Sequence, residues 1–219
     1  MVPSLSIIKT RLSLLSNSVT ISSVANATSL EETTRPEWQQ ARRARIVRAA
    51  LELLEDRDYE MILVRDVAER SGFALSTVYR YFDSKEQLYA AVQVEWARSL
   101  QRNLERRILT GEPRDRFNEL VRRVVLAFER RPQFLRLGTL LENSNDAKTV
   151  ALSREVAERN YASFLEALST LSEDAALQIV FIMTSVLDRL LHRYQRGAAT
   201  IEEVLVAAEE TIDFLFRGI

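Results

Sequence analysis

The stretch over residues 66–87 constrains the fold of this chain more than any other. It reads DVAERSGFALSTVYRYFDSKEQ, which predicts a helix that ends near position 70, a turn at Gly72 and a second short helix over 75–82. Glycine adopts positive φ at little steric cost, so Gly72 suits a tight reversal between two helices. Two short helices joined in this way predict a helix-turn-helix, whose second helix enters the major groove of DNA.

The second of these helices is expected to have an inner and an outer face. Val78 and Phe82 lie four residues apart, so they share one side of a helix and are predicted to pack inward. The outer face carries hydrogen-bonding and cationic side chains, which suit phosphates and base edges. These side chains are Ser76, Thr77, Tyr79, Arg80 and Tyr81.

The same residues carry a resemblance to a known family. The ordered block T-V-Y-R-Y-F-x-S-K-E over 77–86, with V-A-E-R-S-G over 67–72 before it, resembles the tetracycline-repressor (TetR) family of transcriptional regulators. The resemblance reaches back to about Arg42. It implies an all-α fold, in which an N-terminal three-helix DNA-binding domain precedes a helical bundle that binds a ligand and forms a homodimer.

Composition supports an all-helical chain and narrows its function. The 219 residues include only five glycines and four prolines, and no strand-like alternation persists. Basic and acidic residues are nearly balanced, 30 against 31, so DNA binding needs locally concentrated positive charge. With no cysteine and one histidine, the chain favours neither a metal site nor histidine-dependent catalysis. We therefore expect a cytoplasmic, non-enzymatic protein without a cofactor.

Three parts are predicted: an N-terminal extension over 1–34, the DNA-binding domain over 35–83 and the ligand-binding and dimerisation domain over 84–219. The extension is rich in Ser, Thr and Asn, which predicts a mobile segment or a start codon assigned too early. Ala25-Asn26-Ala27 resembles a signal-peptide cleavage site, but polar residues interrupt the apolar stretch before it. After the motif, helices are expected over 84–109, 114–130, 132–142, 146–170, 174–196 and 200–217.

Positive charge is concentrated in the first expected helix, over 36–56. Five arginines stand against one glutamate over residues 35–48, at and just before its start, namely Arg35, Arg42, Arg43, Arg45 and Arg48 against Glu37. Such a run can simply be a solvated helix face. The TetR resemblance places this end of the helix near the DNA backbone, which suits Arg42 and Arg43 as phosphate contacts.

Lys85 lies in the first turn of the fourth helix, where a cation opposes the helix dipole. A nearby DNA phosphate would explain it, in agreement with the family's use of the equivalent lysine. Before it, Ser84 is predicted to cap the helix, in a capping box with Gln87.

Some positions depart from the family's pattern. Ile62 and Leu63 stand where the family commonly has a Thr or Ser that caps the second helix and touches a phosphate, so that contact is not expected here. Ala74 and Leu75 occupy positions that often read bases in the family. Because both are apolar, they can at most touch thymine methyl groups, and Leu75 is expected to pack. Tyr81 is left open between packing and a DNA contact.

The last two expected helices, over 174–196 and 200–217, carry apolar residues on more than one face. Burial inside a bundle would explain this pattern, and so would a second partner. Because two-fold operators require a dimer, and because the family dimerises through its last two helices, we expect a homodimer through these helices.

The middle helices supply apolar and aromatic side chains for a bundle core and an effector site. Candidate effector contacts are Trp96, Phe128, Leu137, Leu141, Asn143, Tyr161, Phe164 and Thr184. Residues 130–143 and 187–218 resemble the KstR-type repressors of cholesterol catabolism. That resemblance implies a small hydrophobic effector, such as a lipid, a sterol or an acyl-CoA-like molecule.

The leading hypothesis is a homodimeric repressor that binds a palindromic double-stranded DNA operator and is released by its effector. One alternative is a helical protein that binds a lipid without binding DNA. Another is a partner-binding helical protein that has lost DNA affinity, which Ile62, Leu63 and Leu75 would favour.

Overall fold

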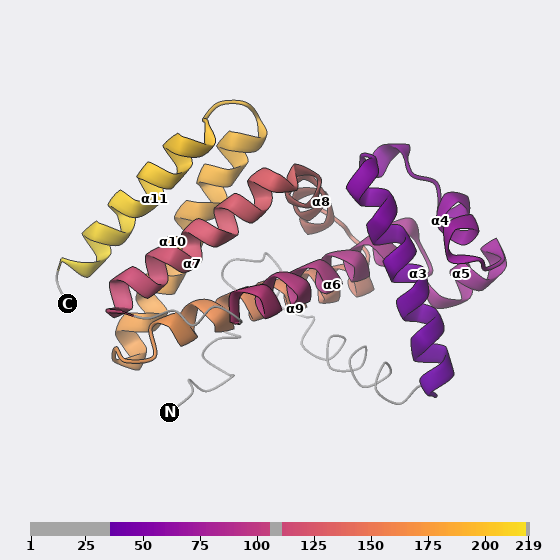
Figure 1. Ribbon diagram of the computed structural model, residues 1–219, viewed down its shortest axis with the longest axis horizontal. Coiled ribbons are helices and arrows are strands. Elements are labelled where there is room, and N and C mark those ends of the chain that lie inside the picture. The colour runs from indigo at the N-terminus through magenta and orange to yellow at the C-terminus, as the bar shows by residue number, and fades with distance from the viewer. Residues whose placement is uncertain (1–35, 106–110, 218–219) are drawn as a thin grey trace. The chain divides into compact units, whose positions relative to one another are not determined.

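The computed structural model describes residues 36–105 and 111–217. These residues form nine α-helices and one 3-10 turn, and no strand occurs among them (Figure 1). The elements are α3 (Glu37–Asp56), η1 (Tyr59–Met61), α4 (Val64–Ser71), α5 (Leu75–Tyr81), α6 (Lys85–Glu105), α7 (Pro113–Arg130), α8 (Pro132–Glu142), α9 (Ala147–Ala167), α10 (Glu173–Gln195) and α11 (Ile201–Phe216). The all-α prediction is confirmed. The expected extension over 1–34 lies outside the described residues, as does the end of the helix predicted over 84–109.

The described residues divide into two compact units. The helix-turn-helix unit comprises 36–99 and 136–156, and the bundle unit comprises 100–105, 111–135 and 157–217. Helices α6, α8 and α9 contribute residues to both units. The helix-turn-helix therefore shares its packing unit with the first half of α6 and with the α8–α9 connection. The predicted domain boundary between residues 83 and 84 stays a prediction.

The helix-turn-helix unit buries one face of each of its first three α-helices. Val78 of α5 and Phe82 directly after it are fully buried, which confirms the predicted inner face of α5. They join a core that α3 and α4 supply with Ile46, Val47, Ala49, Ala50, Leu53, Leu54, Val67 and Ala68.

The turn between α4 and α5 depends on Gly72, whose φ is +71°. In this left-handed conformation its N–H donates to the Glu69 carbonyl, and the next N–H donates to the Ala68 carbonyl at 3.0 Å. These bonds satisfy carbonyls at the end of α4, as a glycine-terminated helix requires. A Cβ at Gly72 would lie 3.0 Å from the Arg45 guanidinium, so the turn also receives a cation from α3.

The bundle unit has its core between α7, the end of α9, α10 and α11. Phe117 of α7 contacts Phe164 of α9 and Phe216 of α11, with ring centroids 5.6 and 6.5 Å apart. Arg114 at the start of α7 pairs with Asp213 of α11 and with Asp115, and these carboxylates raise the pKa of its guanidinium. Aromatic packing and an ion pair therefore hold α11 against α7.

Helix α10 is long and apolar enough to cross a membrane by length and composition alone. Many of its apolar side chains belong to the core of the bundle unit, including Leu177, Val180 and Met183. That burial accounts for the composition of the helix. Apolar side chains also remain exposed on α10 and α11, namely Ile182, Val206 and Phe214.

Candidate nucleic-acid interface

The outer face of α5 is accessible. Ser76 and Arg80 are exposed, Tyr79 is 48% exposed, and Thr77 and Tyr81 are half-buried. The helix begins at Leu75 after the extended residue Ala74, which offers no side-chain cap. Hydroxyl groups, a phenol and a guanidinium are thus presented together on one short helix. These are donors and acceptors that phosphates and base edges can use.

The position of Leu75 differs from the prediction. We expected it to pack, but its side chain is 41% exposed. Val78 and Phe82 already occupy the inner side of α5, and Leu75 lies in the first turn of the helix, next to exposed Ala74. Helical periodicity cannot reveal this, because it assigns a residue to a side of the helix without showing where the core ends.

Arginines of α3 lie over aromatic rings close to α5. The Arg43 guanidinium is 5.0 Å from the centroid of the Phe82 ring, directly after α5. The Arg45 guanidinium is 5.3 Å from the ring of Phe73, before α5. Cation–π contacts of this kind orient a guanidinium without neutralising it. Two cations of α3 therefore lie near the residues that flank the two ends of α5.

Arg42 is held at the start of α3. Its guanidinium lies 4.9 Å from the ring centroid of Trp38, which is itself 55% exposed. Residues 38 and 42 are one helical turn apart, so the pair is local to α3. Arg42 therefore extends the positive surface towards the start of the helix.

Lys85 has a structural partner that the sequence did not reveal. Its ammonium donates to the Tyr59 carbonyl and lies 3.9 Å from the centroid of the Tyr59 ring. Burial lowers the pKa of Lys85, while the charges of Glu60 and Asp66 raise it. The contact with Tyr59 therefore supplies a structural reason for a cation in the first turn of α6, which the sequence alone did not offer. The ammonium has three donors, so a phosphate contact stays a prediction.

Tyr59 joins this lysine to α6. Its ring meets the ring of Tyr89 edge to face, with centroids 5.1 Å apart. Burial, followed by the charges of Glu86 and Glu60, raises the pKa of Tyr59 to about 12. The phenol is therefore neutral at physiological pH and adds no negative charge beside Lys85.

The capping box predicted at α6 forms in part, and α4, where no cap from Ile62 or Leu63 was expected, uses the side chain of Asp66. At α6, Ser84 Oγ accepts the Gln87 N–H at 3.0 Å, which confirms the cap. Gln87 Oε1 instead accepts the N–H of Asp83 at 2.6 Å, so the reciprocal bond of the predicted box shifts by one residue. At α4, the Asp66 carboxylate accepts the N–H of the N-cap residue Leu63 at 3.0 Å, which is the reciprocal half of a capping box. The aliphatic side chain of Leu63 cannot accept the other bond.

The α8–α9 connection is tied to the helix-turn-helix within the same unit. Arg136 of α8 pairs with Asp58, just before η1. The Ser144 hydroxyl donates to Glu86 at 2.6 Å, and Lys148 pairs with Asp83 at 2.5 Å. The sequence shows these charges but no pattern that pairs them across more than fifty positions.

The eight predicted effector residues fall into both units. Trp96, Leu137, Leu141 and Asn143 belong to the helix-turn-helix unit, whereas Phe128, Tyr161, Phe164 and Thr184 belong to the bundle unit. The eight residues therefore do not share one packing unit.

The polar members among them bond to backbone carbonyls. The Tyr161 hydroxyl donates to the Leu177 carbonyl at 3.3 Å, and the Thr184 hydroxyl donates to the Val180 carbonyl at 2.7 Å. Asn143 is exposed, and its amide donates to the Thr139 carbonyl at 2.7 Å. Each side-chain oxygen keeps acceptor capacity for a ligand.

Sequence reasoning missed four buried polar atoms in the helix-turn-helix unit. They are the side-chain oxygens of Tyr89, Gln93, Thr149 and Ser153, none of which has a hydrogen-bond partner within the described part of the chain. An unsatisfied buried polar group lowers the stability of the folded protein by about 1–3 kcal/mol. A ligand or water that formed the missing hydrogen bond would therefore stabilise the protein. The available signal was the spacing, because these residues form pairs four apart on α6 and on α9.

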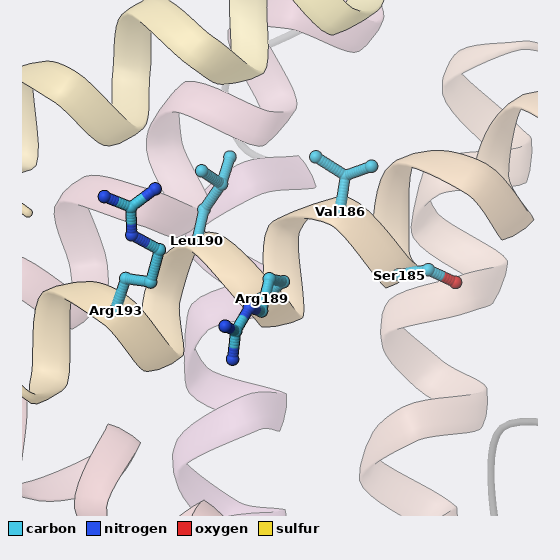
Figure 2. A pocket seen from close by; sticks show the side chains of 5 residues that line it. All are labelled: Ser185, Val186, Arg189, Leu190 and Arg193. Atoms are coloured by element: carbon cyan, nitrogen blue, oxygen red, sulfur yellow. The ribbon is translucent and has the colours of Figure 1, made fainter.

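A surface pocket lies along α10. Figure 2 shows its lining side chains, all of which come from this helix: Ser185, Val186, Arg189, Leu190 and Arg193. None of the eight predicted effector residues lines it. Apolar Leu190 lies between Arg189 and Arg193 there, and Val186 precedes Arg189 on the same helix, which also exposes Ile182.

Comparison with known proteins supports a helix-turn-helix in this chain. Residues 46–92 match the pattern of bacterial regulatory proteins of the tetR family. The HTH-type transcriptional repressor KstR of Rhodococcus jostii is 30% identical over 154 residues, which cover 68% of this chain and 69% of that protein. KstR of Mycolicibacterium smegmatis is 35% identical over 97 residues, which span 44% of this chain and about half (48%) of the length of that relative.

Solved structures share the fold. A TetR transcriptional regulator from Rhodococcus sp. RHA1 superposes with a TM-score of 0.72 at 22% identity, covering 84% of this chain and 100% of that one. FadR from Bacillus subtilis, solved in complex with stearoyl-CoA, gives a TM-score of 0.58 at 14% identity, covering 80% and 98%. At these identities the likeness concerns the fold alone.

Proposed function

Because this chain belongs to the tetR family of bacterial regulatory proteins, we propose that it is a repressor that binds a palindromic operator as a homodimer and is released by a small hydrophobic effector. The observation that carries the proposal is the exposed outer face of α5, together with the guanidinium groups of Arg43 and Arg45 over the aromatic rings that flank this helix. A polar helix flanked by oriented cations suits a groove lined by phosphates.

The two kinds of DNA contact fall to different residues. Residues 76–80 of α5 enter the major groove, where Arg80 can donate to a guanine edge or to a phosphate. Phosphates are held by Arg42, Arg43, Tyr81 and Lys85. Phosphate contacts set the position of the protein on DNA, and base contacts set the sequence that it prefers.

Dimerisation is assigned to α10 and α11. Ile182 of α10 and Val206 and Phe214 of α11 expose large apolar side chains, and Phe214 is 71% exposed. Exposed apolar side chains on neighbouring helices support a docking surface for a second copy. A two-fold dimer places its two readers on half-sites about 34–36 Å apart, or a multiple of that distance.

The effector is proposed to be a lipid, a sterol or an acyl-CoA-like molecule in the cytoplasm. Support comes from the similarity to KstR repressors and from the shared fold with FadR, which was solved with stearoyl-CoA. Within the helix-turn-helix unit, its apolar part would contact Trp96, Leu137 and Leu141, which are three of the eight residues predicted for this role. Its polar group would bond to the orphaned oxygens of Tyr89, Gln93, Thr149 and Ser153. The effector lowers operator affinity only by binding the DNA-incompetent state more tightly.

The test is a binding titration of the full chain, at several salt concentrations, with the promoter fragment next to its own gene. Specific binding with a steep negative salt dependence is expected. Arg80→Ala is expected to lower affinity by about 1–3 kcal/mol and to relax specificity at one position. Arg122→Ala removes an exposed arginine of α7 and should leave affinity unchanged.

Failure to bind any fragment above non-specific affinity at low salt would contradict the proposal. That result would favour a helical lipid-binding or partner-binding protein. The aliphatic pair Ile62 and Leu63, which lacks the hydroxyl of a phosphate contact, is the observation behind this second candidate.

A further inference from the structure

The N-terminal end of α5 is apolar and exposed. Leu75 is the first residue of α5 and is 41% exposed, and Ala74 before it is exposed as well. On the same helix, Val78 and the adjoining Phe82 are 0% and 1% exposed. Leu75 is therefore not part of the core that holds α5 in place.

Single exposed leucines are ordinary on protein surfaces, so exposure alone does not indicate a function for Leu75. Its position in the helix-turn-helix does. In a helix-turn-helix, the N-terminal residues of the second helix contact base edges. Leu75 and Ala74 occupy that end, and neither side chain can donate or accept a hydrogen bond. Whatever they contribute to base selection must come from apolar contact.

The major groove offers one apolar feature, which is the 5-methyl group of thymine. The edges of guanine, adenine and cytosine present donors and acceptors that an aliphatic side chain would desolvate without replacing their bonds. We infer that Leu75 is a specificity-determining residue that contacts the 5-methyl group of one thymine in each half-site. This inference rests on the proposed DNA-binding function.

The contact predicts a measurable preference. Removing one buried methyl group lowers affinity about fourfold, so deoxyuridine in place of the contacted thymine should weaken binding about fourfold per half-site. Deoxyuridine keeps every base-pairing group and every hydrogen-bonding atom of thymine at the groove edge. The comparison therefore isolates the methyl group.

The experiment begins with operator selection by the full chain from random double-stranded DNA. Each thymine of the selected half-site is then replaced by deoxyuridine, symmetrically in both half-sites, and affinity is measured by fluorescence anisotropy. The wild-type chain should lose affinity at one thymine position. Leu75→Ala should show the same affinity for thymine and deoxyuridine at that position, whereas Leu75→Met, which keeps an apolar contact, should retain the preference.

Leu75 lies outside the core, so all three chains are expected to fold alike, which circular dichroism checks. Two results would overturn the inference while leaving DNA binding intact. One is a selected half-site without any position sensitive to deoxyuridine. The other is a deoxyuridine effect that persists in Leu75→Ala, which would assign it to DNA flexibility. Selection that enriches no sequence would remove the proposed function and this inference together.

Discussion

Two regions of this protein expose large apolar side chains, and their surroundings differ. In the helix-turn-helix unit, Leu75 and Tyr79 are exposed on the helix that Arg43 and Arg45 flank. In the bundle unit, Val206 and Phe214 are exposed on α11, a helix with an acidic first turn and no basic residue in its last turn. The same kind of exposure therefore supports different partners. Beside cations it suits DNA, and on α11 it suits a second copy of the chain.

The largest expected effect comes from placing a charge in the apolar surface of the bundle. Phe214→Asp should raise the dissociation constant of the dimer about a hundredfold, because aromatic side chains at the centre of an interface carry much of its binding energy. Sedimentation equilibrium measures the change.

The matched substitution in the other region is Leu75→Asp, which places the same charge on an exposed apolar residue of α5. It should leave the dimer intact and weaken DNA binding through repulsion from phosphates. If Phe214→Asp left the dimerisation constant unchanged, the assignment of α11 to the interface would be lost.

An intermediate effect is expected at the two glycine turns. Gly72 has a φ of +71° and Gly197, between α10 and α11, has a φ of +67°. Alanine in this left-handed conformation costs about 1–2 kcal/mol, so both alanine variants should lose about that much stability in urea unfolding at equal protein concentration.

The glycine variants should differ in function. A Cβ at Gly72 would lie 3.0 Å from the Arg45 guanidinium, whereas nothing lies within 4 Å of one at Gly197. Gly72→Ala should therefore displace Arg45 from Phe73 and weaken DNA binding, whereas Gly197→Ala should preserve it. Equal DNA affinities of the two variants would show that Arg45 has no role in binding.

Most of the fold could be predicted because helical periodicity and the proline and glycine residues that start or end helices are local signals in the sequence. Pro132 begins α8, and Gly72 and Gly197 follow the ends of α4 and α10, as the sequence indicated, while α7 begins at Pro113, one residue before the predicted start at 114. The inner face of α5 followed from the four-residue spacing of Val78 and Phe82, for the same reason.

The surroundings of the candidate site could not be predicted to the same extent. The bond from Lys85 to Tyr59 and the pair of Arg136 with Asp58 join residues 26 and 78 positions apart. The charge of a lysine or arginine does not reveal which of the 31 acidic residues, or which backbone carbonyl, will be its partner. The exposure of Leu75 depends on where the core ends, which periodicity does not report.

The smallest expected effect separates the two roles of Lys85, the structural contact with Tyr59 and the predicted phosphate contact. Lys85→Met keeps an apolar stem over the Tyr59 ring and removes the charge, whereas Lys85→Ala removes both. If Lys85 binds a phosphate, both variants should reduce the salt dependence of operator binding by about one ion per subunit.

Stability should distinguish the variants of Lys85. The ammonium lies 3.9 Å from the ring centroid of Tyr59, so Lys85→Ala also removes packing and should unfold at lower urea than Lys85→Met. An unchanged salt slope in both variants would assign Lys85 to the Tyr59 contact alone. In that case the phosphate-binding cations of this region would be those of α3, where aromatic rings orient Arg42 and Arg43 while leaving them charged.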